Sequence, residues 1–135
     1  MNKTLVILFS LGLFLFSCNS NKKSAPQTDI ETATAFIRDI LDNDLSGAEQ
    51  YLLKDESNQQ YFDIIKQQYK KKDKAELDKY KAADIIINEN SAVTDSVTVI
   101  NYSNSYKRES KSKLKLVRIN GKWLVDLKYT FSGNM

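Results

Sequence analysis

The sequence contains no histidine, one cysteine and one proline among its 135 residues. Histidine is the commonest general base and a common zinc ligand, so its absence excludes catalytic triads, Cys–His dyads and histidine-based metal sites. A single cysteine cannot form a disulfide within the chain, so the fold has to be stable without one. The sequence also has no glycine-rich phosphate loop and no cluster of metal ligands. We therefore expect no cofactor and no metal.

The charge balance is close to neutral once the first 17 residues are set aside. Lys3 is the only charged residue among them, and the remainder carries 19 basic and 17 acidic side chains. Nucleic-acid-binding domains usually show a strong basic excess on one face. We therefore expect no nucleic-acid partner.

The amino terminus has the pattern of a secretory signal peptide. Lys3 provides a positive end, and residues 5–16 form a mostly apolar run that is too short for the roughly 20 residues that span a bilayer. This pattern predicts a signal peptide over residues 1–17.

The end of this run, Leu15-Phe16-Ser17-Cys18, resembles the lipobox of bacterial lipoproteins, although Phe16 is bulkier than that motif prefers. The resemblance implies that acyl chains are attached to Cys18, and more than one chain gives stable anchoring. We expect a cell-envelope protein that is lipid-anchored on the periplasmic face of the outer membrane. The alternative is an ordinary signal peptide cut nearby, which leaves Cys18 as a free thiol.

Residues 18–27 follow as the lipidated cysteine and a polar tether, and 28–131 have the length of one domain. Thr28 and Glu31 have the spacing of a capping box, which predicts a helix to about Asp42. Asp44 is placed to cap a second, short helix.

Ser57, with Gln60 three residues later, predicts the start of a third helix. It has one apolar side, made of Tyr61, Ile64, Ile65 and Tyr69. The lysine-rich stretch from Lys70 to Lys79 either continues this helix or frays.

Period-two alternation and β-branched residues begin after Lys81 and predict strands. The first two are expected over 84–87 and 93–102, separated by a turn at 88–91, and residues 103–105 separate the second from a third strand ending at Ile119. The predicted architecture is α+β, with N-terminal helices packed on an antiparallel sheet of about four strands.

Asn120-Gly121 is a strong hairpin signal that favours a type I′ turn. The turn sets the register, so Ile119 should pair with Lys122, Leu116 with Val125, and Leu114 with Leu127. One face of the last strand is then expected to carry Trp123, Val125, Leu127, Tyr129 and Phe131.

Three features together resemble the nuclear-transport-factor-2-like superfamily, a cystatin-like α+β fold: the helix starting near Thr28, the DLSGAEQYL segment at 44–52, and the hairpin LKLVRINGKWLVD at 114–126. The chain is similar to small bacterial lipoproteins of unknown function in that superfamily. The resemblance implies a cone formed by a curved sheet around a long helix, with a cavity inside. Sheet-mediated dimers are frequent in the superfamily, so the resemblance is compatible with a homodimer.

The residues expected to bind a ligand in this cone are Tyr51, Tyr61, Trp123, Val125, Leu127 and Tyr129. They combine apolar surface with tyrosine hydroxyls that can orient a ligand. Core packing is the usual role of tyrosines at such spacings.

Enzymes of the superfamily use a carboxylate, tyrosine or histidine inside the cone for proton transfer. Only Asp95 shares a predicted strand face with apolar neighbours, Val93 and Val97, whereas Asp126 is expected on the opposite face from Trp123. A buried Asp95 could act as a base, but an aspartate at a strand end usually faces solvent.

Residues 66–81 contain seven lysines, which could contact anionic lipid headgroups, although interleaved acidic residues favour a solvated helix face.

Two functions remain open from the sequence. The first is a non-enzymatic, membrane-tethered binding or interaction domain, whose ligand is a small amphipathic molecule, a cell-wall fragment or another envelope protein. The alternative is a small-molecule isomerase or hydratase that uses a carboxylate in the cone.

Overall fold

The computed structural model describes residues 25–132 of the chain. The predicted signal peptide, Cys18 and the first part of the tether lie outside these residues. In chain order the elements are α1 (Asp29–Leu41), α2 (Leu45–Glu49), α3 (Glu56–Lys70), α4 (Lys74–Lys81), β1 (Ile85–Thr94), β2 (Val97–Asn104), β3 (Ser112–Ile119), β4 (Lys122–Asp126) and α5 (Leu127–Phe131).

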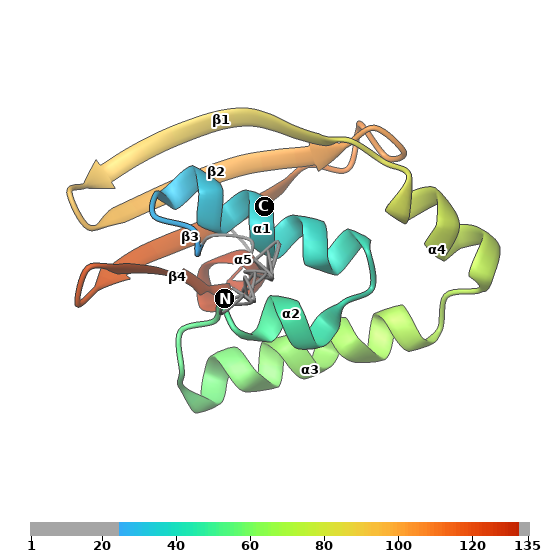
Figure 1. Cartoon of the computed structure of the whole chain (residues 1–135), viewed down its shortest axis with the longest axis horizontal. Helices are drawn as coiled ribbons and strands as arrows, with labels where there is room; N and C mark the ends of the chain where they lie inside the picture. Colours follow the sequence, from blue (N-terminus) through green and yellow to red (C-terminus); the bar gives the residue numbers. More distant parts are fainter. Residues whose placement is uncertain (1–24, 133–135) are drawn as a thin grey trace, which may run out of the picture.

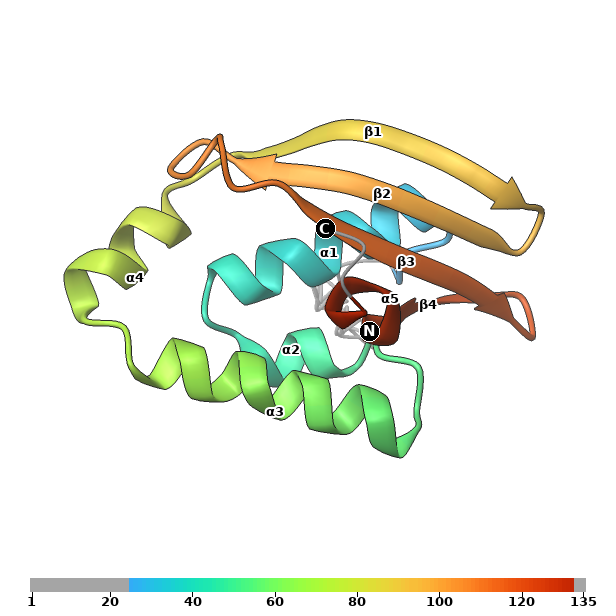
Figure 2. The ribbon, with the colours of Figure 1, turned by 180° about the vertical axis from the view of Figure 1, so that it is seen from behind.

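The described part of the chain is an α+β fold, as predicted, with one antiparallel sheet in the order β1-β2-β3-β4. Figure 1 shows β1 and β2 curving over α1, with α2 and α3 on the far side of α1. Seen from behind in Figure 2, α4 leads from the end of α3 to the start of β1 at one end of the molecule.

The two predicted caps of the first helices are confirmed. The Thr28 side chain accepts a hydrogen bond from the backbone N–H of Glu31, and the Glu31 carboxylate accepts one from the Thr28 N–H, which completes the capping box of α1. The Asp44 side chain accepts from the Gly47 N–H and begins α2. Both caps act within four residues, so local sequence is sufficient to predict them.

Helix α3 begins one residue before the predicted Ser57, and its predicted apolar side is confirmed at Tyr69, which is buried, and at Tyr61 and Ile65, which pack against the core. Its cap is Asp55, two residues before Ser57, and the Asp55 side chain accepts from the Asn58 N–H. The side facing the core contains Asn58, Phe62 and Tyr69, whereas Ile64 is 41% exposed. The prediction was wrong at Ile64 and omitted Asn58 and Phe62, which are both buried.

The lysine-rich stretch neither continues α3 nor frays. Helix α3 ends at Lys70, and Asp73 caps the separate helix α4 by accepting from the Glu76 N–H.

The first β-hairpin differs from the prediction in the position of its turn. Residues 88–91 lie within β1, and the chain reverses at Asp95 and Ser96. The register of β1 against β2 shifts between Ile87 and Glu89, which is an irregularity of the β-bulge kind in this long strand. The polar 88–91 sequence is tolerated because this part of β1 is largely exposed at the sheet edge. Residues 105–111 form a loop, so β3 begins only at Ser112.

The Asn120-Gly121 turn and its register are confirmed. Both residues have positive φ, 51° and 77°, as a type I′ turn requires. Ile119 pairs with Lys122, and Leu116 pairs with Val125.

The pairing of Leu114 with Leu127 was wrong, because β4 ends at Asp126 and residues 127–131 form α5. The Asp126 side chain accepts from the Lys128 N–H, and the Asn58 side chain accepts from the Leu127 N–H. These two bonds satisfy backbone donors at the start of the helix. Residues 127, 129 and 131 therefore do not share a strand face.

The core lies between α1 and the inner face of the sheet. Thr98, Leu116 and Val125 form one row across β2, β3 and β4, and Ile100 pairs with Leu114 beside it. All five side chains are at most 1% exposed. Helix α1 covers them with its buried residues Ala33, Phe36, Ile37 and Leu41.

Candidate functional site

A cavity of about 400 Å³ lies between the helices and the inner face of the sheet. This volume falls within the range of small-molecule pockets. The apolar part of its lining includes Phe36, Ile37, Leu41, Leu114, Leu127 and Phe131. Apolar side chains thus form the base of a site that α1, β3 and α5 hold together.

The polar lining lies mainly at the end of the cavity near the β2–β3 loop. Gln68, Lys107 and Ser110 line the cavity and are themselves exposed. We infer that the cavity opens between α3 and this loop. Lys107 is the one charged residue among the described residues that line the cavity.

Three tyrosines from different elements also line the cavity: Tyr69 of α3, Tyr80 of α4 and Tyr102 of β2. The rings of Tyr69 and Tyr80 lie 6.0 Å apart. Burial raises the pKa of both the Tyr69 and Tyr102 hydroxyls above the usual value of 10.0. Both hydroxyls therefore stay protonated at neutral pH and can donate hydrogen bonds.

A cluster of lysines and aromatic rings borders the opening. The Lys107 Nζ lies 5.2 Å from the ring centre of Tyr80 and 5.4 Å from that of Tyr106, and the Lys72 Nζ lies 4.8 Å from that of Tyr80. The Glu76 carboxylate is 3.0 Å from Lys72 and 3.5 Å from Lys107. The Tyr80 hydroxyl, followed by Glu76, raises the pKa of Lys107, so its ammonium is charged at neutral pH.

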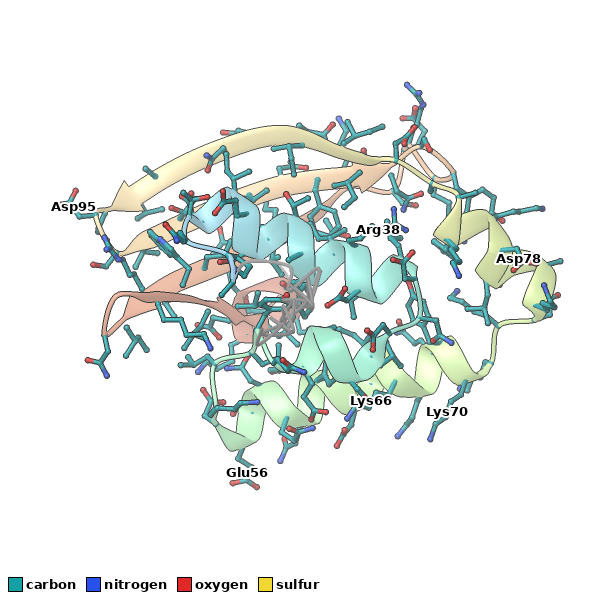
Figure 3. The ribbon with its side chains drawn as sticks, viewed as in Figure 1. Arg38, Glu56, Lys66, Lys70, Asp78 and Asp95 are labelled. Carbon is teal, nitrogen blue, oxygen red and sulfur yellow. The ribbon has the colours of Figure 1, made fainter. Side chains whose placement is uncertain are left out.

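Arg38 holds the carboxyl end of α4 against α1, and Figure 3 shows it between the two helices. Its guanidinium donates to the carbonyl oxygens of Ala83, at 2.9 Å, and Lys81, at 3.1 Å. It also forms a 3.0 Å ion pair with Asp42. Arg38 thereby positions the helix that brings Tyr80 to the cavity.

The predicted ligand-binding residues do not come together in this cavity. Leu127 lines it, and Tyr61 lies behind it, stacked on Phe131 with ring centres 4.8 Å apart. Val125 is wholly buried in the core. Tyr51 and Trp123 line a separate hollow near the start of α1, and Tyr129 lines another beside Val99 and Lys113 of the sheet.

Sequence reasoning missed Tyr80, Tyr102 and Lys107. Tyr80 lies in the lysine-rich stretch that was expected to be solvated, and it is only 9% exposed. Lys107 was expected on a strand but belongs to the β2–β3 loop. In the sequence, Tyr80 is the one aromatic residue of the lysine-rich stretch 70–81, and this is the signal that could have identified it.

The aspartates that were considered as bases do not line the cavity. Asp95 is exposed in the β1–β2 turn, and Figure 3 shows it at the outer tip of that hairpin. Asp126 was expected to face away from the core, but it is 6% exposed and lies 3.6 Å from the Lys115 Nζ and 3.7 Å from the Lys128 Nζ. Its strand ends there, so its carboxylate caps α5 and forms these ion pairs.

Several lysines of the 66–81 segment are already paired with carboxylates. Lys66 pairs with Glu49, at 3.2 Å, and Lys74 pairs with Asp78, at 2.6 Å. This pairing favours a solvated surface over a headgroup-binding face.

Neither a metal centre nor a membrane-spanning helix is found between residues 25 and 132. No group of three or more acidic, histidine or cysteine residues there is arranged to hold a metal ion. The helices of this region are also too short or too polar to cross a membrane.

Comparison with known proteins finds no match: no protein-family model, no curated protein and no solved structure is detectably similar to this chain.

Proposed function

We propose that this chain is an exported lipoprotein, tethered to the cell-envelope membrane through Cys18, whose folded part binds a small amphipathic molecule without transforming it. The proposal includes that this folded part is a cone of the nuclear-transport-factor-2-like superfamily. The resemblance of the hairpin at 114–126 to that superfamily supports this part of the proposal. The observation that carries the binding function is the 400 Å³ cavity with an apolar base and a polar opening.

The composition of the lining supports binding more than proton transfer. An apolar base gains free energy by removing hydrocarbon from water, at about 25 cal/mol per Å² buried. The tyrosine hydroxyls supply directed hydrogen bonds at known positions. Among the described lining residues there is no carboxylate, which an isomerase or hydratase of the expected kind would need as a base.

A chain of residues 19–135, produced without its signal peptide, tests the binding function. Isothermal titration calorimetry with decanoate and decanol, each below the concentration at which it forms micelles or a separate phase, should give saturable binding of at least one. Gln68→Trp should weaken that binding because Gln68 lines the opening, while Gln67→Trp should not, because Gln67 is an exposed neighbour on α3 outside the lining. Equal affinities of the two variants, or no binding of either amphiphile, would contradict the proposal.

The tether is tested separately with the full chain expressed in a bacterium. Mass spectrometry of the membrane fraction should find acyl chains on Cys18, and Cys18→Ala should release the protein from the membrane. An unmodified Cys18 in the processed protein, or a Cys18→Ala variant that stays membrane-bound, would contradict the anchoring.

A further inference from the structure

We infer that the cavity takes an amphiphile with an anionic head, which binds at Lys107 while its hydrocarbon part occupies the apolar base. This inference rests on the proposed binding function and adds the chemical class of the ligand. The shared chemistry is a single negative head on an apolar chain, and the head is either a carboxylate or a phosphate.

The charge of the cavity lining favours an anionic ligand. Lys107 is the charged residue that the described chain contributes to the cavity wall, so the wall is positive at one place and otherwise neutral. A cationic ligand would find no negative partner in this wall. A neutral ligand would leave the ammonium without a ligand partner.

Lys107 keeps room for another hydrogen bond. An ammonium has three donors, and the oxygen atoms that interact with the Lys107 Nζ are those of Glu76, at a long 3.5 Å, and of the Tyr80 hydroxyl. Its other neighbours are the rings of Tyr80 and Tyr106, whose centres lie 5.2 Å and 5.4 Å from the Nζ. The side chain is 41% exposed, so a further acceptor can approach it.

The charge around the opening of the cavity also favours an anion. Glu76 is shared between Lys72 and Lys107, and its closer partner is Lys72. Lys79 adds a third ammonium, 5.6 Å from the ring centre of Tyr106. Three lysines against one carboxylate leave this cluster positive, which favours the approach of an anion.

The position of Lys107 relative to the base supports an amphiphile over a free anion. Leu114 and Leu127 are at most 1% exposed, and they line the same cavity as Lys107. Tyr102 of β2 lines the same cavity. A small inorganic anion would contact Lys107 but would leave the apolar base unused.

The experiment compares decanoate, decyl phosphate, decanol and decyltrimethylammonium by calorimetry, using residues 19–135. At least one anionic probe should bind about three- to fivefold more tightly than decanol, which is the upper part of the range of an exposed charge pair. The cationic probe should bind more weakly than decanol. The preference for the anion should shrink as salt is raised, because partly exposed charges are screened.

Lys107→Gln should abolish the preference for the anionic probe over decanol, whereas Lys111→Gln, an exposed change in the same loop outside the lining, should preserve it. The better of the two anionic probes identifies the head as a carboxylate or a phosphate.

Two results would overturn the inference while leaving the proposed function intact. One is equal binding of decanol and both anions, with Gln68→Trp still weakening all three. The other is an anion preference that persists in Lys107→Gln. If none of the four probes binds, the proposed function and this inference fail together.

Discussion

The Asn58 Oδ1 accepts a 2.7 Å hydrogen bond from the backbone N–H of Leu127, and both residues are buried. This bond joins α3 to the start of α5, across 69 residues of sequence. The Asn58 Nδ2 donates to Asp55, so one amide links both helix starts.

Asn58→Ala should lower the free energy of unfolding by about 2 to 3 kcal/mol, because it leaves the buried Leu127 N–H without an acceptor. Urea unfolding followed by circular dichroism measures the change. Gln67→Ala, at an exposed position of the same helix, should stay within about 0.5 kcal/mol of the unchanged protein. Equal effects of the two variants would contradict the role of the Asn58 bond.

Asp55 should make stability depend on acid pH. Its 2.6 Å interaction with Lys128, followed by the Asn58 N–H, lowers the pKa of Asp55 below 3.8. As the pH falls through 3.8, the unfolded chain therefore takes up a proton before the native chain does, and the native state loses stability. This contribution is fully present above 3.8 and is lost as the pH falls through the native pKa.

Asp55→Asn keeps an acceptor for the helix cap but removes the charge. It should lower stability at pH 7 and make little difference at a pH below the native pKa of Asp55, as measured by urea unfolding at both pH values. Lys128→Gln should reproduce this pattern. If Asp55→Asn lowers the free energy of unfolding equally at both pH values, the loss comes instead from a weaker cap by the asparagine.

Arg38→Met should loosen α4, because the Arg38 guanidinium donates hydrogen bonds to the carbonyl oxygens of Ala83 and Lys81. We expect a loss of about 2 kcal/mol and faster hydrogen exchange over residues 74–83. Lys74→Met removes the exposed i,i+4 pair with Asp78 and should cost less than about 0.5 kcal/mol. Unchanged exchange in Arg38→Met would show that α4 is held by other contacts.

Gly121→Ala should destabilise the β3–β4 hairpin by about 1 kcal/mol through its positive φ of 77°. A Cβ at this position meets no atom within 4 Å, so the cost comes from the backbone alone. Asn120→Gly keeps the positive φ accessible and should change stability little. Thermal unfolding of both variants measures the difference, and a neutral Gly121→Ala would exclude the type I′ geometry.

Trp123 should not report on ligands in the cavity. It lies in the hollow with Tyr51, and that hollow shares no lining residue with the cavity. The Trp123 emission should therefore stay constant while decanoate raises the unfolding temperature through linkage. Trp123→Phe should leave decanoate affinity within about twofold, whereas Phe131→Ala should weaken it because Phe131 lines the cavity. A decanoate-dependent shift of Trp123 emission would place the ligand elsewhere.

The sequence by itself determined the features that depend on a few neighbouring residues. Thr28 and Glu31 form the capping box, Asp44 caps α2, and Asn120-Gly121 sets the register of β3 and β4. In each case the deciding hydrogen bonds or backbone angles lie within four residues, so tertiary packing does not need to be known.

Only the tertiary structure decided where β1 turns and where β4 ends. The 88–91 sequence favours a turn locally, but pairing with β2 continues through it to Thr94. Residues 127–131 alternate like a strand, but Asn58, 69 residues earlier, accepts from the Leu127 N–H at the point where α5 begins. The cavity has the same origin, because Tyr69, Tyr80, Tyr102 and Lys107 come from three elements and a loop. Long-range hydrogen bonds and packing outweigh local preference at these positions, and no short window of sequence contains both partners.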